Sequence, residues 1–395
     1  MELDTARVLT LGRDSKQATY CIHDDLVSRQ HASIHWNDES RSYRIVDRGS
    51  RNGLAINGKR CNTTLLQVGD VIRLGMSLLV VVDESNRTAF AQAKSALYRN
   101  SGHVLLTGEP GVGKEHLAQQ IHRHSRRRGK FIAVDCAALN HDTAVRELFG
   151  IERADQSDSN ASNTGLLGAA EHGTLFLNEV ADLPNPIQVL LSRVMRRNRM
   201  RPVGTVTEQE TDVRIVASTT VPLDRVTSRG MFRLDLYARL TDIQIHIPAI
   251  RERRQDILEI LANLAVSEGL KLRVDADAAE ALLLGAWPLN VCGLRQVVAR
   301  ITSRKSGVLD LATLRKIEPA LATELKSRRN SPTRSSVKLP NAHKTLRERS
   351  SLEQLLAEHH GNVAKVAKDL GTTRAQIYRW MSRLGIDVDS LRGIG

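Results

Sequence analysis

The sequence predicts a multidomain chain that begins with an all-β sandwich, continues with an α/β domain and a helical subdomain, and ends in a three-helix unit. Its 395 residues are too many for one ordinary domain. Short strand-like runs between turn signals fill residues 1–85, which is the pattern of a sandwich. Apolar strands alternate with helical stretches over residues 86–250, as in a parallel α/β sheet, and residues 251–323 look entirely helical.

The composition is that of a globular protein with an excess of positive charge. Apolar residues make up 41% of the chain, which excludes wholesale disorder. The 57 Lys and Arg residues exceed the 44 Asp and Glu residues by 13, which favours a polyanionic partner. Because aromatic residues are only 3%, contact with nucleic acid should depend on charge and helix docking rather than on base stacking.

Nothing in the sequence indicates a membrane or an oxidising compartment. The N-terminus has no basic segment followed by an apolar one, as a secretory signal has, and the longest apolar run, residues 78–82, is too short to span a bilayer. The four cysteines are scattered without disulfide or metal-ligand spacing: Cys21, Cys61, Cys136 and Cys292. We therefore expect a cytoplasmic protein with no membrane partner and no metal site built from cysteines.

Four loop clusters of the N-terminal region carry side chains suited to a phosphate dianion. They lie at residues 12–13, 28–32, 49–53 and 57–58, between expected strands. Their charged and hydroxyl donors are Arg13, Ser28, Arg29, Ser50 and Arg51, followed by Asn52, whose amide could hold a ligand's backbone. Any one cluster alone is better explained as turn-forming Ser and Asn beside solvated arginines.

Taken in order, the four clusters resemble the forkhead-associated (FHA) domain, which binds phosphothreonine peptides. The resemblance covers residues 1–85 and includes the Gly-Arg, Ser-x-x-His and Ser-x-Asn-Gly signatures. It implies that Asn52 binds the ligand main chain, that His31 supports the loop, and that five residues contact phosphate: Arg13, Ser28, Arg29, Ser50 and Arg51. A phosphothreonine-containing protein is therefore an expected partner.

A glycine-rich string follows the first apolar strand of the α/β region. Residues 108–114 fit the pattern G-x-x-x-x-G-K, between a strand at 104–106 and an amphipathic helix. Glycines let backbone N–H groups close on phosphate oxygens, and the lysine adds charge at the β- and γ-phosphates. A chance match is the alternative, and the strand–loop–helix context argues against it. The candidate nucleotide-binding residues are Gly108, Glu109, Pro110, Gly111, Val112, Gly113, Lys114 and Glu115, with Asn178 at the end of a later strand.

Later strings resemble the AAA+ domain of bacterial enhancer-binding proteins, the sigma-54-dependent transcription activators. They include HLAQQIHRHS, GTLFLNEVADLP, FRLDLYARL, IPAIRERRQDI and WPLNVCGLRQVV, within residues 86–323. The resemblance implies a nucleotide-binding domain over residues 86–250, a helical lid over 251–323, and ATP and Mg²⁺ as cofactors. It also implies that Glu179 activates water, and that Arg233 and Arg239 are arginine fingers that reach a neighbouring subunit's nucleotide. The chain should then form a homo-oligomer.

The sequence departs from this family at four positions that serve hydrolysis. Where the family has Asp, Asn, Asn and Arg, this chain has Asn178, Asp135, Thr220 and Cys292. A neutral ligand offsets the Mg²⁺ charge less well, and a lost arginine contact to a charged transition state is costly. We expect ATP to bind, Mg²⁺ to bind weakly, and hydrolysis to be weak or lost. The alternative is a functional ATPase that activates sigma-54 RNA polymerase.

The loop with which the family grips sigma-54 has also changed. Its GAFTGA motif aligns with residues 154–159, which read Ala-Asp-Gln-Ser-Asp-Ser. A polar, acidic loop has no apolar anchor for a partner. We therefore expect that the protein does not remodel sigma-54 polymerase by the usual power stroke.

The C-terminal region reads as a basic flexible linker at residues 324–345 and a helix–turn–helix at 346–395. Val363, Val366, Ile377 and Met381 belong to two apolar stripes with helical spacing. The region resembles the Fis-type helix–turn–helix, and its alternative is a small structural hairpin with a solvated basic face. The residues expected to face DNA are Thr373, Arg374, Gln376, Tyr378, Arg379 and Arg383.

Together these features favour a DNA-binding transcription regulator that senses a phosphothreonine partner and binds ATP. Besides the functional ATPase, a signalling scaffold with incidental DNA contact is a further interpretation. ATP turnover separates the first two, and selective binding to a promoter fragment argues against the scaffold.

Overall fold

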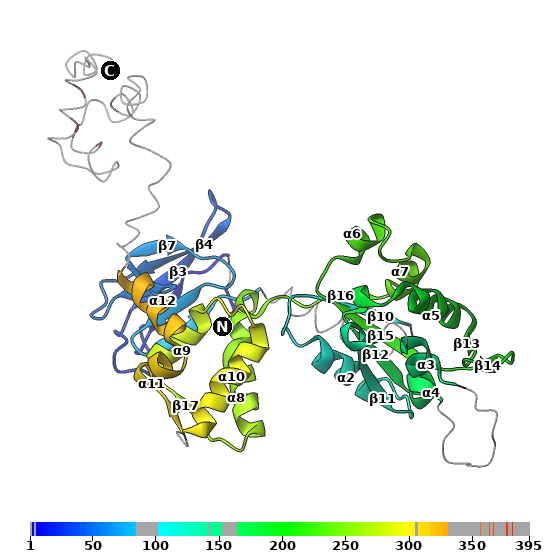
Figure 1. Ribbon diagram of the computed structural model, residues 1–395. Coiled ribbons are helices and arrows are strands. Elements are labelled where there is room, and N and C mark those ends of the chain that lie inside the picture. Colours follow the sequence, from blue (N-terminus) through cyan, green and yellow to red (C-terminus); the bar gives the residue numbers. More distant parts are fainter. Residues whose placement is uncertain are drawn as a thin grey trace. The chain divides into compact units, whose positions relative to one another are not determined.

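The computed structural model describes residues 2–3, 5–83, 102–140, 143–151, 164–304 and 307–330, together with Leu356, Val363, Val366, Ile377 and Met381. These residues form two compact units, and Figure 1 labels their helices and strands. The first holds the chain up to Ala55 together with Lys59–Leu66. The second holds Ile56–Gly58 and Gln67–Asn330.

The N-terminal region is all-β, as expected. Its five-stranded sheet has the order β2-β1-β3-β4-β7, with strands β1 (Leu9–Gly12), β2 (Tyr20–Cys21), β3 (Ala32–Asn37), β4 (Ser42–Asp47) and β7 (Thr63–Leu65). A four-stranded sheet has the order β6-β5-β8-β9, with β5 (Leu54–Ile56), β6 (Lys59–Cys61), β8 (Val71–Leu74) and β9 (Ser77–Val80). The core-facing side chains Leu11, Ile34 and Ile45 are at most 1% exposed. Each of them follows a polar residue, Thr10, Ser33 or Arg44, and successive side chains of a strand point to opposite faces of the sheet.

The central region contains a fully parallel five-stranded sheet. Its order is β11-β12-β15-β10-β16, with β10 (Val104–Thr107), β11 (Phe131–Asp135), β12 (Thr174–Asn178), β15 (Arg214–Thr219) and β16 (Gln244–His246). Helix α2 (Lys114–His124) packs on the face that carries Leu106 and Phe176, and α5 (Asn185–Arg197) packs on the face that carries Leu175. Burial on both faces explains why these strands are almost continuously apolar.

Shorter elements complete the α/β region. They are η1 (Cys136–Ala138), α3 (Ala144–Phe149), α4 (Gly165–Ala169), η2 (Val180–Asp182), β13 (Arg199–Met200), β14 (Gln209–Glu210), α6 (Leu223–Ser228) and α7 (Leu234–Leu240). Because β10, β12 and β15 are parallel, their carboxyl ends meet at one edge of the sheet. The glycine-rich loop and Asn178 lie at this edge, where open α/β sheets bind ligands.

The lid is mainly helical, but the expectation of an entirely helical region at 251–323 is wrong. Its elements are η3 (Ile250–Glu252), η4 (Arg254–Asp256), α8 (Ile257–Ser267), β17 (Arg273–Val274), α9 (Ala276–Leu284), α10 (Asn290–Ser303), β18 (Val308–Leu309), α11 (Leu311–Ile317) and α12 (Pro319–Asn330). Strands β17 and β18 pair in parallel. Asp275 and Asp310 then cap α9 and α11, each accepting a backbone hydrogen bond. Both cap residues have an extended backbone, so each strand continues directly into the start of its helix.

Helix α12 also corrects the expected start of the basic linker at residue 324. The helix continues through Asn330 because Leu325 is 1% exposed in the lid core and Arg328 pairs with Glu324 at 2.7 Å. One helical turn separates these two charges, which is the spacing at which they attract. The remaining linker residues, 331–345, lie outside the described part of the chain.

Two other expectations fall mostly outside the described residues. Residues 154–159, expected in place of GAFTGA, are not described. Of the helix–turn–helix, Leu356, Val363, Val366, Ile377 and Met381 are helical and at most 5% exposed, in agreement with the apolar stripes. The candidate DNA-facing residues Thr373, Arg374, Gln376, Tyr378, Arg379 and Arg383 are not described. Among the described helices, none is long and apolar enough to cross a membrane.

Candidate nucleotide and phosphopeptide sites

The glycine-rich loop between β10 and α2 has a backbone that only glycine adopts readily. Gly108, Gly111 and Gly113 have φ angles of 149°, 75° and 103°. A Cβ atom would stand 2.5 Å from the Ile247 carbonyl oxygen at Gly108 and 2.4 Å from that of Leu289 at Gly111. The loop therefore closes tightly and ends on the N-terminus of an 11-residue helix, whose free N–H groups suit an anion.

Lys114 is buried at the start of α2 and points back into the loop. Its Nζ donates to the Gly108 carbonyl at 2.9 Å and lies 3.2 Å from Oε1 of Glu179. Glu115, the next residue, is exposed in the first turn of the helix. The structure thus brings the expected phosphate-binding lysine and the expected catalytic glutamate together.

Glu179 follows β12 and is held on both carboxylate oxygens. Its φ angle is 50°, in the left-handed region. The backbone N–H and the hydroxyl of Thr220 donate to Oε2 at 2.8 and 2.9 Å. Thr220, which stands where the family has an Asn sensor, therefore binds the carboxylate that would activate water. The left-handed conformation of a non-glycine residue costs energy, and these contacts help to hold it.

Asn178 lies in a polar row that crosses three strands. Its Oδ1 accepts a hydrogen bond of 2.8 Å from the Ser218 hydroxyl on β15. On the other side its register partner is Asp135 at the end of β11. Neighbouring parallel strands lie about 4.8 Å apart with paired side chains on one face. Asp135 therefore places a carboxylate beside the neutral amide, and oxygen ligands of this kind suit Mg²⁺.

Three lid residues that the sequence analysis missed bind the loop directly. Arg251 holds the Glu109 carboxylate with two hydrogen bonds of 2.8 and 2.5 Å. The Asn290 amide donates to Glu109 at 3.2 Å and to the Pro110 carbonyl at 2.9 Å, and Arg253 donates to the Val112 carbonyl at 2.7 Å. Hydrogen bonds from Arg251 and then Asn290 lower the pKa of Glu109 to about 2. These contacts between the lid and the loop depend on tertiary packing, so no spacing of residues in the sequence predicts them.

Cys292 also lies beside the loop. Its Sγ stands 3.3 Å from the point where a Cβ atom of Gly111 would lie, and the cysteine is exposed. The neighbouring Val291 N–H donates to the Gly111 carbonyl at 3.0 Å. The position at which the family has a sensor arginine thus faces the loop, and here it carries a thiol in place of a guanidinium.

The two expected arginine fingers lie on or next to α7. Arg233 donates to Asp235 at 2.9 and 3.1 Å, and Asp235 also accepts a hydrogen bond from Ser192 at 3.0 Å. Arg239 is partly buried on the same helix. Within the described part of the chain, neither arginine makes a hydrogen bond or ion pair with the glycine-rich loop.

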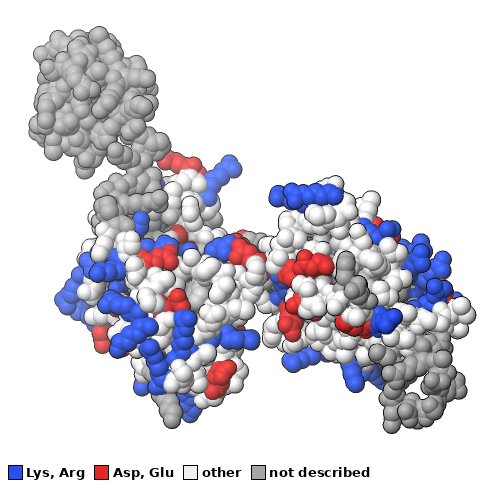
Figure 2. Space-filling model, in the orientation of Figure 1, with Lys and Arg blue, Asp and Glu red and all other residues white. Residues whose placement is uncertain are grey.

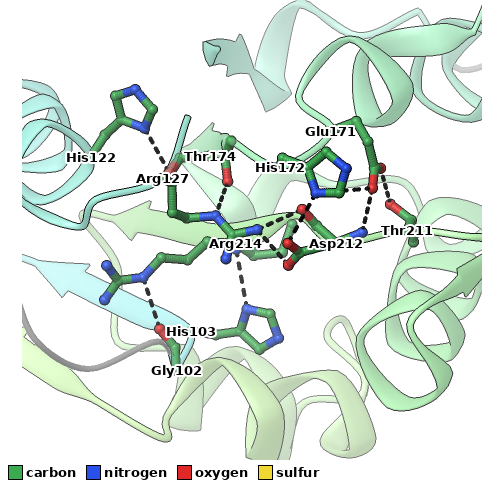
Figure 3. A network of polar contacts seen from close by, with 12 residues as sticks. Gly102, His103, His122, Arg127, Glu171, His172, Thr174, Thr211, Asp212 and Arg214 are labelled. Carbon is green, nitrogen blue, oxygen red and sulfur yellow. Dashed lines mark hydrogen bonds and ion pairs between the residues drawn. The ribbon is translucent and has the colours of Figure 1, made fainter. Parts of the chain in front are cut away.

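A separate polar network lies at the opposite end of the parallel sheet (Figure 3). Arg127 donates to Asp212 and to the Gly173 carbonyl, and His172 contacts Asp212 at 3.2 Å. Arg214, 1% exposed, donates to the Gly102 carbonyl at 3.0 Å. These contacts tie the starts of the strands to their preceding loops, so the network has a structural role away from the nucleotide edge.

In the N-terminal unit, buried His31 joins two of the predicted phosphate-binding loops. Its Nδ1 accepts from the Ser28 N–H at 3.1 Å, and its Nε2 donates to the Gly53 carbonyl at 3.0 Å. The Ser28 hydroxyl accepts from the Arg51 N–H at 3.1 Å, and the Asn52 amide donates to the Leu26 carbonyl at 2.6 Å. Ser28, Arg51 and Asn52 are therefore neighbours.

The remaining phosphate candidates lie around the same loops. Arg13 and Arg29 line a hollow of about 570 Å³, and Arg13 lies 3.8 Å from Asp25. A Cβ atom on Gly12 would stand 2.0 Å from the Arg29 carbonyl oxygen, so this close approach requires glycine. The Ser50 hydroxyl accepts from the Gly53 N–H at 3.0 Å, which closes its turn. Arg13, Arg29 and Arg51 are all exposed.

Three protein families match the chain in sequence order. They are the FHA domain at residues 9–75, the sigma-54 interaction domain at 79–246, and the Fis family of bacterial regulatory proteins at 345–384. The transcriptional regulatory protein GlrR of Escherichia coli is 34% identical over 296 residues, which are 73% of this chain and 64% of that protein. The nitric oxide reductase transcription regulator NorR1 of Cupriavidus necator is 36% identical over 305 residues, 71% of this chain and 59% of that protein.

Solved structures agree with these matches. NtrX from Brucella abortus in complex with ATP has a TM-score of 0.52 at 28% identity, covering 76% of this chain and 68% of that chain. Its complex with ADP has a TM-score of 0.53 at the same identity. This chain spans 64% and 59% of the lengths of these two curated relatives. By these matches the chain carries an FHA domain, a sigma-54 interaction domain and a Fis-type region in that order, and it is similar to bacterial transcriptional regulatory proteins.

Proposed function

We propose that this protein is a DNA-binding transcription regulator that binds ATP, hydrolyses it weakly or not at all, and senses a phosphothreonine partner through its FHA domain. The observation that carries this proposal is the contrast within the nucleotide site. The glycine-rich loop is closed and supported by the lid, whereas Glu179 is held by Lys114 and Thr220. The groups that would bind the nucleotide are retained. Those that serve hydrolysis are either replaced by other residues or already bonded to neighbouring side chains.

ATP binding is supported by the loop geometry and by the related NtrX structures with ATP and ADP. Backbone N–H groups of the loop and the N-terminus of α2 would bind the phosphates, with Lys114 adding charge. Mg²⁺, when bound, would neutralise phosphate charge. Asn178 and its register partner Asp135 are the residues that would hold it.

Weak hydrolysis follows from the electrostatics of the same site. Catalysis of phosphoryl transfer depends on positioned charges more than on covalent chemistry. Asn178 supplies no negative charge at the metal, and Cys292 supplies no positive charge beside the loop. The carboxylate oxygens of Glu179 already hold Thr220 and Lys114, and these donors compete with a water for the same carboxylate. Arg233 and Arg239 would act on the nucleotide of a neighbouring copy, which makes a homo-oligomer part of the proposal.

Phosphothreonine recognition is supported by the exposed arginines Arg13, Arg29 and Arg51 around a framework that His31 holds together. Arginine forks match phosphate oxygens well.

DNA binding is assigned to the Fis-type region. Figure 2 shows Lys and Arg interspersed with Asp and Glu on the visible face of the described units, without one continuous basic surface there. Residues 154–159 lack the GAFTGA motif with which the family contacts sigma-54. Remodelling of sigma-54 polymerase is therefore not part of the proposed function.

The test is ATP binding and turnover by the full chain. The wild type should bind ATP and turn it over near background, while Asn178→Asp combined with Cys292→Arg should raise turnover. Lys114→Met serves as the control that loses binding. Brisk turnover by the wild type, together with activation of a sigma-54 promoter, would favour the functional ATPase instead. Selective binding to a promoter fragment separates both from a scaffold.

A further inference from the structure

The hairpin strands β8 and β9 share a hydrophobic core with the lid. Val71 of β8 is 1% exposed and belongs to the same buried cluster as Leu284 and Leu325, and Leu78 and Val80 of β9 pack against this cluster. Both strands contact α9. Residues 67–330 form one compact unit, so this strand pair belongs to the same body as the lid. The sequence boundary at residue 85 therefore does not separate two cores.

A charge cluster around the buried Glu280 connects the strand pair to the lid. Glu280 of α9 is 1% exposed and pairs with Arg73 of β8 at 2.6 Å and with Arg329 of α12 at 2.5 Å. Asp277 pairs with the same two arginines at 2.6 and 2.8 Å. Two positive and two negative groups thus balance one another. Arg73 is one of the two arginines that pair with buried Glu280, so removing it leaves this carboxylate with Arg329 alone, which is unfavourable.

A single short segment of the lid holds both the strand pair and the nucleotide loop. Arg254 donates to the Gly69 carbonyl, in the turn before β8, at 2.8 Å. One and three residues earlier, Arg253 and Arg251 bind the Val112 carbonyl and the Glu109 carboxylate of the glycine-rich loop. The distance along the chain between the two sets of contacts is less than one helical turn. A shift of this segment therefore changes both.

We propose that the strand pair β8–β9 forms the outer wall of the nucleotide lid, and that the charge cluster around Glu280 sustains nucleotide affinity from outside the pocket. The inference rests on nucleotide binding at the glycine-rich loop. Arg251, Arg253 and Asn290 hold the loop in its closed form before a ligand arrives. If the strand pair loosens the lid, the loop loses this preorganisation and the ligand must order it.

The experiment compares the full-length wild type with Arg73→Met, which keeps an apolar stem and loses the charge. ADP affinity is measured by titration, and amide hydrogen exchange of residues 108–114 is measured without nucleotide. We expect the ADP Kd to rise on the order of tenfold and loop exchange to accelerate. The matched control is Arg41→Met, an exposed arginine in the turn between β3 and β4, which should change neither quantity.

The two readouts separate failure of this inference from failure of nucleotide binding. If the wild type does not bind ADP, the proposed function is wrong and the claim about nucleotide affinity falls with it, while loop exchange still decides whether the strand pair supports the loop. If Arg73→Met changes neither loop exchange nor ADP affinity, the inference is wrong. Should Arg73→Met fail to fold, Arg254→Gln tests the same connection at its partly buried end. Unchanged loop exchange in Arg254→Gln would overturn the inference equally.

Discussion

The two candidate phosphate sites of this chain are built in opposite ways. The nucleotide site is closed: Lys114 is 7% exposed, and internal carbonyl and carboxylate oxygens already surround it. The candidate phosphopeptide site is open, because Arg13, Arg29 and Arg51 are exposed and only their support, His31, is buried. In the closed site, the groups that would bind phosphate also make the contacts that stabilise the local structure. In the open site, binding and stability reside in different residues, so they should respond separately to substitution.

The largest effect is expected at the closed site. Lys114→Met removes the charge that the phosphates would meet and leaves Glu179 without its ion pair. We expect ATP affinity to fall by about 100-fold or more, together with a lower Tm, since the partly buried Glu179 loses its ion-pair partner. Titration with ATP and thermal unfolding measure the two effects. A variant that binds ATP as the wild type does would show that this loop is not the phosphate site.

A somewhat smaller effect is expected at the open site, where stability should be spared. Arg13→Ala combined with Arg29→Ala removes two exposed charges from the hollow that they line. Phosphothreonine peptide affinity should fall about 100-fold with an unchanged Tm, because exposed charges contribute little to folding. A peptide array that identifies a ligand comes first, and Arg41→Ala is the matched control. Equal losses of binding and of Tm would remove the contrast between the sites.

Much of the fold could be predicted because it depends on local sequence patterns, namely the spacing of apolar residues and the positions of glycines. The strands around 104–107 and 174–178 are apolar runs that a parallel sheet requires, and the loop before Lys114 has glycines where positive φ angles occur. The framework role of His31 agrees with the FHA signature. These features need only spacing and residue type, so sequence alone reveals them.

What could not be predicted depends on contacts between distant segments. Arg251 and Asn290 reach Glu109 across 142 and 181 positions, and no periodicity encodes such a meeting. The contact of Thr220 with Glu179 likewise required the ends of two strands to be placed. Strands β17 and β18 have only two residues each, which is too short for an alternating pattern to be recognised.

The next prediction concerns the negative charge that would bind the metal in the closed site. This charge is either absent, because position 178 is Asn, or supplied by Asp135 on the neighbouring strand. Asp135 and Asn178 are register partners, so exchanging them keeps one carboxylate and one amide. Asp135→Asn should weaken the effect of Mg²⁺ on ADP affinity about tenfold, because no carboxylate of the pair remains. The exchanged pair, Asp135→Asn with Asn178→Asp, should restore it. ADP titrations with and without Mg²⁺ measure this, and an unchanged Mg²⁺ effect in Asp135→Asn would show that Asp135 does not serve the metal.

The smallest effect is expected from pH, again at the closed site. Hydrogen bonds from Arg251 and Asn290 lower the pKa of Glu109 from its ordinary value of 4.5 to about 2. The folded chain therefore keeps this carboxylate ionised where the unfolded chain takes up a proton. Its contribution to stability is complete above pH 4.5 and is lost as the pH falls from 4.5 toward 2.

The measurement for this pH effect is the Tm of the wild type and of Glu109→Gln as a function of pH. The wild type should be the more stable at neutral pH, and the difference should shrink below pH 4.5 because only the wild type loses an ionised partner of Arg251. Glu39→Gln, at an exposed turn, is the matched control. A constant difference across this range would mean that the lid holds the loop without help from the Glu109 charge, leaving the backbone contacts of Asn290 and Arg253 to close the site.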